Sequence, residues 1–113
     1  MTEFCSGVGR IVSAVWNADI GYLDYGVTAE GWSERMVSAL GHAQRLVTAT
    51  SGDQRAAGQR LLDAVSAASA PPQDAGNPEN IGAVMPILRQ INGGVGGCVD
   101  NGTEVAILAE WGG

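Results

Sequence analysis

The residues best able to do chemistry in this chain are its two cysteines, Cys5 and Cys98, and its only histidine, His42. Thiolates and imidazoles are the ligands of structural zinc sites, but two cysteines and one histidine cannot complete the usual four-ligand set. The cysteines are also too far apart for the Cys-x-x-Cys spacing of a redox pair. A disulfide bond or two free thiols remain as the alternatives, and no metal site is expected.

The surroundings of the two cysteines favour a disulfide between them. Both lie beside glycines at the edges of helical blocks, at opposite ends of the chain, so a bond would tie the first helix to the last connection. Closing such a loop stabilises a domain by roughly 4–5 kcal/mol in the chain-entropy model. A disulfide predicts an oxidising compartment, either periplasm-like, secreted or at the cell surface. The alternative, two buried reduced cysteines, leaves a cytoplasmic location open.

Aromatic residues are concentrated in one stretch of the chain. Four of the six lie between positions 16 and 32 and, because Tyr and Trp combine a large apolar body with a polar tip, they could line a pocket for an apolar or planar ligand. The candidate pocket residues are Trp16, Tyr22, Tyr25, Trp32, Met36 and, at the mouth, His42. A haem iron held by His42 with Tyr22 or Tyr25 is one form of this hypothesis. The favoured alternative is an aromatic anchor in the core between the first two helices.

Catalytic patterns are scarce. The chain has no Gly-x-Ser-x-Gly, and its glycine-rich stretches lack the Gly-Lys-Ser/Thr of a phosphate-binding loop. A cysteine with His42 could form a thiol-based nucleophile, but no orienting motif accompanies them. Glu30 and Glu34 have the i, i+4 spacing of a solvated helix face. We therefore expect no catalytic residues and no cofactor, and the sequence favours a protein that is not an enzyme while leaving an enzyme open.

The composition is that of a small acidic globular domain. The 113 residues are 45% hydrophobic, which predicts one core and one domain spanning 1–113. The net charge of −6 repels nucleic-acid phosphates and anionic lipid heads, so nucleic acid is not an expected partner. No apolar run approaches the roughly 20 residues of a membrane-spanning helix, and the N-terminus lacks the basic and apolar regions of a signal peptide. Arginine without lysine, beside abundant alanine and glycine, is typical of a high-GC bacterial genome.

Apolar residues recur at helical spacing in five blocks, and the alternation typical of strands is scarce. The blocks predict helices over about 6–20, 28–50, 51–70, 78–91 and 103–111, the last of which could also form a strand. In the first block Val8, Ile11, Val12 and Val15 share one face, and Asp19 is expected to face away from it. The predicted fold class is therefore all-α, a compact bundle of four or five short helices stapled by one disulfide.

Capping residues and helix breakers set the predicted helix ends. Thr28 is an expected N-cap, and Ser51 with Gln54 has the spacing of a capping box. Gly21 and Gly26 are expected to break the first helix. Pro86 is expected to kink the fourth helix or to lie near its start, because proline lacks the backbone donor and clashes with the preceding turn.

These observations favour a non-enzymatic extracytoplasmic module that binds a protein or a cell-envelope component through its helical faces. The alternative is a carrier or sensor of a small apolar ligand, with its pocket near the aromatic stretch. An exposed apolar patch would favour the first hypothesis, and a contiguous apolar cavity the second.

Overall fold

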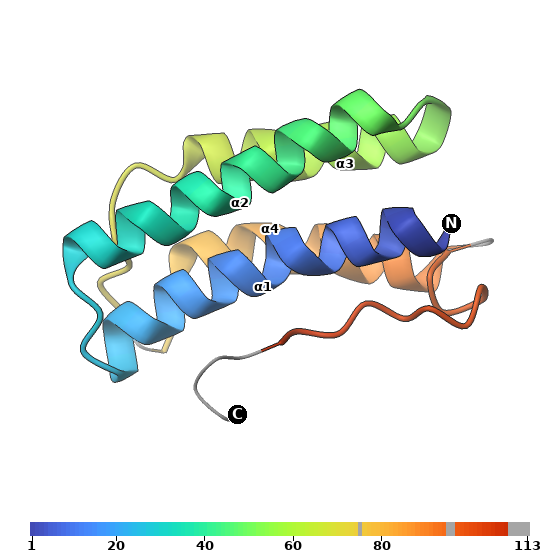
Figure 1. The fold of residues 1–113 in the computed structure, drawn as a ribbon. Helices are drawn as coiled ribbons and strands as arrows, with labels where there is room; N and C mark the ends of the chain where they lie inside the picture. The colour runs from blue at the N-terminus through green and yellow to red at the C-terminus, as the bar shows by residue number, and fades with distance from the viewer. Residues whose placement is uncertain (75, 95–96, 109–113) are drawn as a thin grey trace.

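Four helices follow one another in the described part of the chain, which comprises residues 1–74, 76–94 and 97–108 of a computed structural model. They are α1 (Thr2–Asp24), α2 (Ala29–Ala49), α3 (Gly52–Ala67) and α4 (Glu79–Gly93). The helices run alternately up and down, and each packs against two neighbours in a square arrangement (Figure 1). The predicted all-α bundle is confirmed, in the up-down-up-down form that short connections produce.

The core lies between the four helices, with α1 contributing most of its fully buried side chains. Val8, Ile11, Val12 and Val15 are all 0% exposed, as their helical spacing predicted. Apolar residues from the other helices close around them: Met36, Ala39, Ala43, Leu46, Leu61, Val65, Ile81, Val84 and Leu88. Burial of one large aliphatic side chain contributes about 1.5–3 kcal/mol, so this core is the main driving force for folding.

Helix α1 is longer at both ends than the predicted span of 6–20. It begins at Thr2 and continues through Gly21 to Asp24, so the expectation that Gly21 breaks the helix was wrong. The Gly21 carbonyl accepts hydrogen bonds from the backbone N–H groups of Tyr25 and Val27, both at 3.0 Å, which close the last turn. The chain leaves the helix at Gly26, whose φ of +75° is readily adopted only by glycine.

Asp19 faces the core rather than solvent, which corrects the expectation from the sequence. Its side chain is 0% exposed and accepts four hydrogen bonds. Oδ1 accepts from Trp32 Nε1 and from Asn80 Nδ2, each at 3.0 Å, and Oδ2 accepts from the backbone N–H groups of Asn80 (3.1 Å) and Ile81 (3.0 Å). Because the N-cap residue of α4 is Pro78, which has no side chain able to cap, α1 supplies the cap from a distance.

The other predicted helix ends are partly confirmed. Thr28 caps α2 as expected, its Oγ1 accepting from the Gly31 N–H at 3.0 Å. Ser51 occupies the N-cap position of α3, but its side chain makes no capping hydrogen bond, so the predicted capping box does not form. Pro86 lies inside α4 on its exposed face, away from the helix start. Since the backbone there faces water, solvent can replace the hydrogen bond that proline removes.

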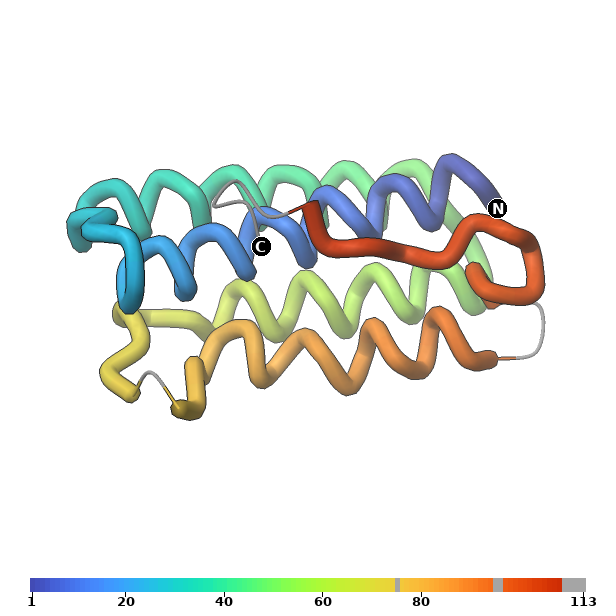
Figure 2. The backbone as a smooth tube through the Cα atoms, turned by 90° about the horizontal axis from the view of Figure 1, so that it is seen from below, coloured from blue at the N-terminus to red at the C-terminus, as the bar shows by residue number. Residues whose placement is uncertain are grey.

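The last block does not form the predicted helix. Residues 103–108 have no regular secondary structure and lie alongside α1, running in the same direction (Figure 2). The remainder of the predicted helix, 109–111, lies outside the described residues. Side chains from the bundle bind the backbone of this segment and replace the hydrogen bonds that a helix would make within itself. The Asn92 side chain, for example, binds both backbone polar groups of Val105.

The two cysteine sulfurs are at bonding distance, 2.03 Å, and join the first turns of α1 to the segment that follows α4. Cys5 and Cys98 are both buried, at 3% and 0% exposed. The pair spans 93 positions of the sequence and holds the start of the C-terminal segment beside α1. Within the described residues, none of the helices combines the length and apolar character needed to cross a bilayer.

Candidate functional site

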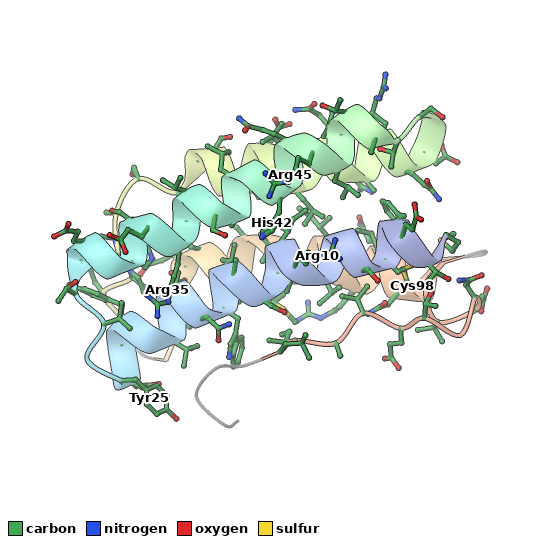
Figure 3. All side chains as sticks on the ribbon, in the orientation of Figure 1. Arg10, Tyr25, Arg35, His42, Arg45 and Cys98 are labelled. Atoms are coloured by element: carbon green, nitrogen blue, oxygen red, sulfur yellow. A yellow bond between two sulfur atoms is a disulfide. The ribbon has the colours of Figure 1, made fainter. Side chains whose placement is uncertain are left out.

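The residues predicted to line an aromatic pocket are distributed over several places. Trp32 and Met36 are buried and line a hollow of about 260 Å³ between α2 and the end of α3. Trp16 and Tyr22 are partly buried and pack against the core. Tyr25 is 53% exposed and lies at the end of α1, far from the middle of the bundle (Figure 3). Of the predicted pocket residues, the structure therefore brings Trp32 and Met36 together. Trp32 also donates a hydrogen bond to the buried Asp19, which gives it a structural role in the core.

His42 lies apart from the aromatic stretch. It is half-buried on α2, beside Arg10 of α1, and both residues line the same groove (Figure 3). Along α1, Tyr22 lies 12 positions beyond Arg10, which is a distance of about 18 Å at a rise of 1.5 Å per residue. The structure does not bring His42 and Tyr22 to a common point at which both could ligate one iron.

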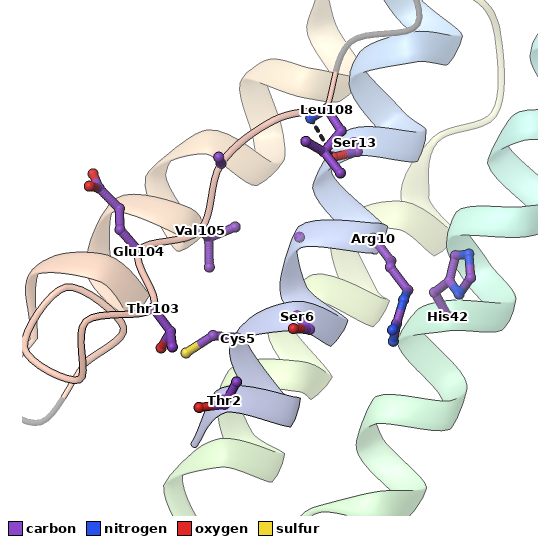
Figure 4. Close-up of a pocket in the computed structure, with 12 residues that line it drawn as sticks. Thr2, Cys5, Ser6, Arg10, Ser13, His42, Thr103, Glu104, Val105 and Leu108 are labelled. Carbon is purple, nitrogen blue, oxygen red and sulfur yellow. Dashed lines mark hydrogen bonds between the residues drawn. The ribbon is translucent and has the colours of Figure 1, made fainter.

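A larger groove, of about 540 Å³, lies between α1 and the C-terminal segment (Figure 4). Its lining residues are Thr2, Cys5, Ser6, Gly9, Arg10, Ser13, His42, Thr103, Glu104, Val105, Ala106 and Leu108. Arg10 and His42 lie next to each other at the edge that faces α2, and Glu104 lies at the opposite edge. Cys5 and His42 were candidates from the sequence, whereas the groove itself was not predicted.

One stripe of α1 holds the C-terminal segment in place. Cys5, Gly9, Ser13 and Asn17 follow one another at intervals of four positions and therefore share a face. Cys5 is bonded to Cys98, and a Cβ atom on Gly9 would lie 3.6 Å from a methyl group of Val105. This stripe is the sequence signal by which the groove could have been found, because three small or polar residues, Gly9, Ser13 and Asn17, recur on one face of the helix.

The far end of the segment is held by hydrogen bonds from the same stripe. Ser13 Oγ accepts from the Leu108 N–H at 2.9 Å, and Asn17 Nδ2 donates to the Leu108 carbonyl at 3.1 Å. Ser13 and Asn17 are only 8% and 7% exposed, so these bonds are shielded from water. Both backbone groups of Leu108 are thus satisfied while its side chain, 76% exposed, remains at the rim of the groove.

Positive charge gathers where the groove meets α2. Arg45 Nη2 donates to His42 Nδ1 at 2.9 Å. A guanidinium can only donate, so the ring is neutral with its proton on Nε2, which faces Ser38 Oγ at 3.5 Å. Burial lowers the pKa of His42, and the nearby charges of Arg45 and Arg10 lower it further. This part of the surface therefore favours an anion over an additional cation.

Neither a free thiol nor a cluster of metal ligands is found among the described residues of the groove. Cys5 and Cys98 are joined to each other, so the hypothesis of a cysteine nucleophile beside His42 has no free thiol in this structure. Among the described residues, no three His, Cys, Asp or Glu side chains are grouped so as to hold a metal ion. The groove offers hydroxyl groups, the cationic side chain of Arg10 and the neutral ring of His42 at one edge, and apolar side chains along the C-terminal segment.

Comparison of this chain with protein-family models, with curated proteins and with solved structures finds no match. The function is therefore inferred from the arrangement of its own residues.

Proposed function

We propose that the protein is a non-enzymatic binding module of an oxidising, extracytoplasmic compartment, and that it takes up a cell-envelope component in the groove between α1 and residues 103–108. The observation that carries the proposal is the groove itself, about 540 Å³ in volume and bounded by a chain segment that a disulfide holds in place. Grooves of about 300–1,000 Å³ are the usual size of small-molecule sites in proteins.

The disulfide supports both the location and the binding role. A bond that holds the wall of the groove beside α1 would be lost in a reducing cytoplasm, where thiols are kept reduced. Without it, the segment would be held by hydrogen bonds from Ser13, Asn17 and Asn92 and by the packing of Val105. The site and the compartment are therefore linked, because an oxidising environment preserves the wall that the ligand contacts.

Site-specific photocross-linking tests the binding role. Ala106 is exposed and lines the groove, whereas Ala56 is exposed on α3 and lies outside it. With p-benzoylphenylalanine at Ala106, irradiation in a cell-envelope extract should give a defined mass adduct, and the same probe at Ala56 should not. Equal labelling at both positions, or none at Ala106, would contradict the proposal.

The compartment is tested separately in acid-quenched cells that express the gene. Cys5 and Cys98 should resist mass-tagging with a maleimide until a reductant is added, since a disulfide does not react with it. Tagging of both cysteines without reductant would place the protein in a reducing compartment.

The hollow beside Trp32 and Met36 supports a second candidate function, the carriage of a small apolar ligand. Its volume of about 260 Å³ is about half that of the groove beside α1. A ligand at this place would change the fluorescence of Trp32 and leave a probe at Ala106 unlabelled.

A further inference from the structure

The charges around the groove are unevenly distributed. The chain carries a net charge of −6, yet Arg10 from α1 and Arg45 from α2 are close enough to His42 for both to lower its pKa. Within the described residues, no hydrogen bond or ion pair engages the Arg10 guanidinium, while Arg45 donates to His42. An arginine without a partner beside a second arginine is a ready donor for an anionic group, because guanidinium hydrogen bonds to carboxylates and phosphates are among the strongest in proteins.

Two carboxylates lie near these cationic groups and do not neutralise them. Glu3 lines a smaller hollow, of about 190 Å³, together with Arg10, His42 and Arg45. Glu104 is at the opposite edge of the main groove (Figure 4). In the part of the chain that the structure describes, neither carboxylate forms an ion pair with these arginines. The lowered pKa of His42 agrees with this geometry, since the charges that act on it are positive.

The rest of the groove is suited to an aliphatic chain. Val105 lies at its floor, 8% exposed, and Leu108 lies at its rim, 76% exposed, with Ala106 between them along the segment. Gly9 on the α1 side packs directly against this segment, because a Cβ atom there would lie 3.6 Å from a Val105 methyl group, so the lack of a side chain lets the segment approach α1 closely. The hydroxyl groups of Thr2 and Ser6 line the groove on the α1 side and can donate to an oxygen that the arginines leave unpaired.

We propose that the ligand is an amphipathic anion with a single aliphatic chain, whose carboxylate or phosphate head binds Arg10 and His42 at the edge of the groove, next to Arg45, while its chain lies along Val105, Ala106 and Leu108. The inference rests on the function proposed above and names the class of envelope component that the groove accepts. The net negative charge of the protein does not oppose it, because charges further away than a Debye length of about 8 Å are largely screened at physiological salt. A monomeric anion is then bound by short-range contacts, although an anionic membrane surface is repelled.

The test uses four probes with the same ten-carbon chain and different heads: decanoate, decyl phosphate, decanol and decyltrimethylammonium, each below its micellar concentration. Two-dimensional NMR on the full chain follows the methyl groups of Val105 and Leu108 and the ring of His42. The dissociation constant of decanoate should be at least tenfold lower than that of decanol, and the cationic probe should not bind. Comparison of decanoate with decyl phosphate distinguishes a carboxylate head from a phosphate head.

Arg10→Gln removes the Arg10 guanidinium and should weaken decanoate binding about tenfold while leaving decanol binding unchanged. Arg55→Gln is the matched control, because Arg55 lies on α3 and has the same charge. If Arg10→Gln disturbs the fold, Arg45→Gln tests the same corner from α2. A second readout is independent of affinity: bound decanoate should raise the pKa of His42, since an anion at the arginines favours the charged imidazolium.

The outcomes separate this inference from the function on which it rests. Equal affinity for decanoate and decanol, or no effect of Arg10→Gln and Arg45→Gln, overturns the anionic ligand. If the Ala106 probe nevertheless cross-links an envelope component, the proposed binding role stands and only the anionic nature of the ligand is refuted. Chemical shift changes centred on Trp32 and Met36 would assign binding to the other hollow and overturn both proposals.

Discussion

Replacement of Asp19 by asparagine tests whether one buried side chain joins three helices. Asparagine has the same shape but keeps one acceptor oxygen and places an NH₂ group where the other was. In the folded protein each oxygen of Asp19 accepts two hydrogen bonds, one pair from Trp32 and the Asn80 side chain and the other from two backbone N–H groups at the start of α4. Whichever way the new amide turns, its nitrogen faces two donors.

The cost of Asp19→Asn follows from those two donors. A buried donor left without an acceptor costs about 1–3 kcal/mol, so the two together should lower the free energy of unfolding by roughly 2–6 kcal/mol. That is a large share of the 5–15 kcal/mol by which domains are typically stable. Asp63→Asn is the control, because Asp63 is exposed on α3 and bonds only the Gln59 side chain among the described residues, at 2.8 Å. It should change stability by less than about 0.5 kcal/mol.

The assay is urea denaturation followed by circular dichroism and tryptophan fluorescence, with amide hydrogen exchange to locate the effect. Exchange should accelerate first at Asn80 and Ile81, whose N–H groups lose their acceptor. If Asp19→Asn leaves no folded protein, Trp32→Phe removes a single donor and should cost about 1–3 kcal/mol. A loss below about 1 kcal/mol for Asp19→Asn, no greater than that for Asp63→Asn, would refute the capping role of Asp19.

Three further predictions concern the disulfide, a glycine and the histidine. Non-reducing mass spectrometry should find the chain two hydrogens lighter than the dithiol form, and Cys5→Ser/Cys98→Ser should lower stability by roughly 4–5 kcal/mol and reduce Tm. Gly97→Ala should cost about 2–3 kcal/mol in a thermal melt, because its Cβ would collide with the Ile91 carbonyl oxygen, whereas Gly82→Ala, on an open helical surface, should be neutral or stabilising. An NMR titration should give His42 a pKa below 6.5. The folded protein then binds fewer protons than the unfolded chain. The contribution of His42 to stability is therefore present above pH 6.5 and is lost as the pH falls through the lowered pKa. His42→Gln should remove this part of the pH dependence of stability.

Much of the fold could be predicted from the sequence, because helical periodicity and capping are local properties. The apolar spacing of Val8, Ile11, Val12 and Val15 indicated which face of α1 is buried, and Thr28 marked the start of α2. Cys5 and Cys98 are the one pair that can bond within the chain, and their positions at helix ends favoured a disulfide over two free thiols, which the sequence left as the alternative. Their sulfurs lie at bonding distance in the structure.

The tertiary structure decided which partners satisfy the polar groups. Asp19 was expected to face solvent because no residue near it in the sequence needs a buried carboxylate. Its hydrogen-bond donors are Trp32, 13 positions away, and the first residues of α4, 61 and 62 positions away. Residues 103–108 have the apolar spacing of a helix, but their backbone is bound instead by Ser13, Asn17 and Asn92.

The candidate site is also a feature that only the tertiary structure decided. His42 was identified from the sequence as a candidate site residue, yet Arg10 comes close to His42 and Arg45 only when α1 and α2 pack. The stripe Cys5, Gly9, Ser13 and Asn17 is visible in the sequence, but what covers it is not. Periodicity reports which face of a helix is apolar and is set by neighbours within a few positions, whereas a groove is set by residues that chain folding brings together from opposite ends of the sequence.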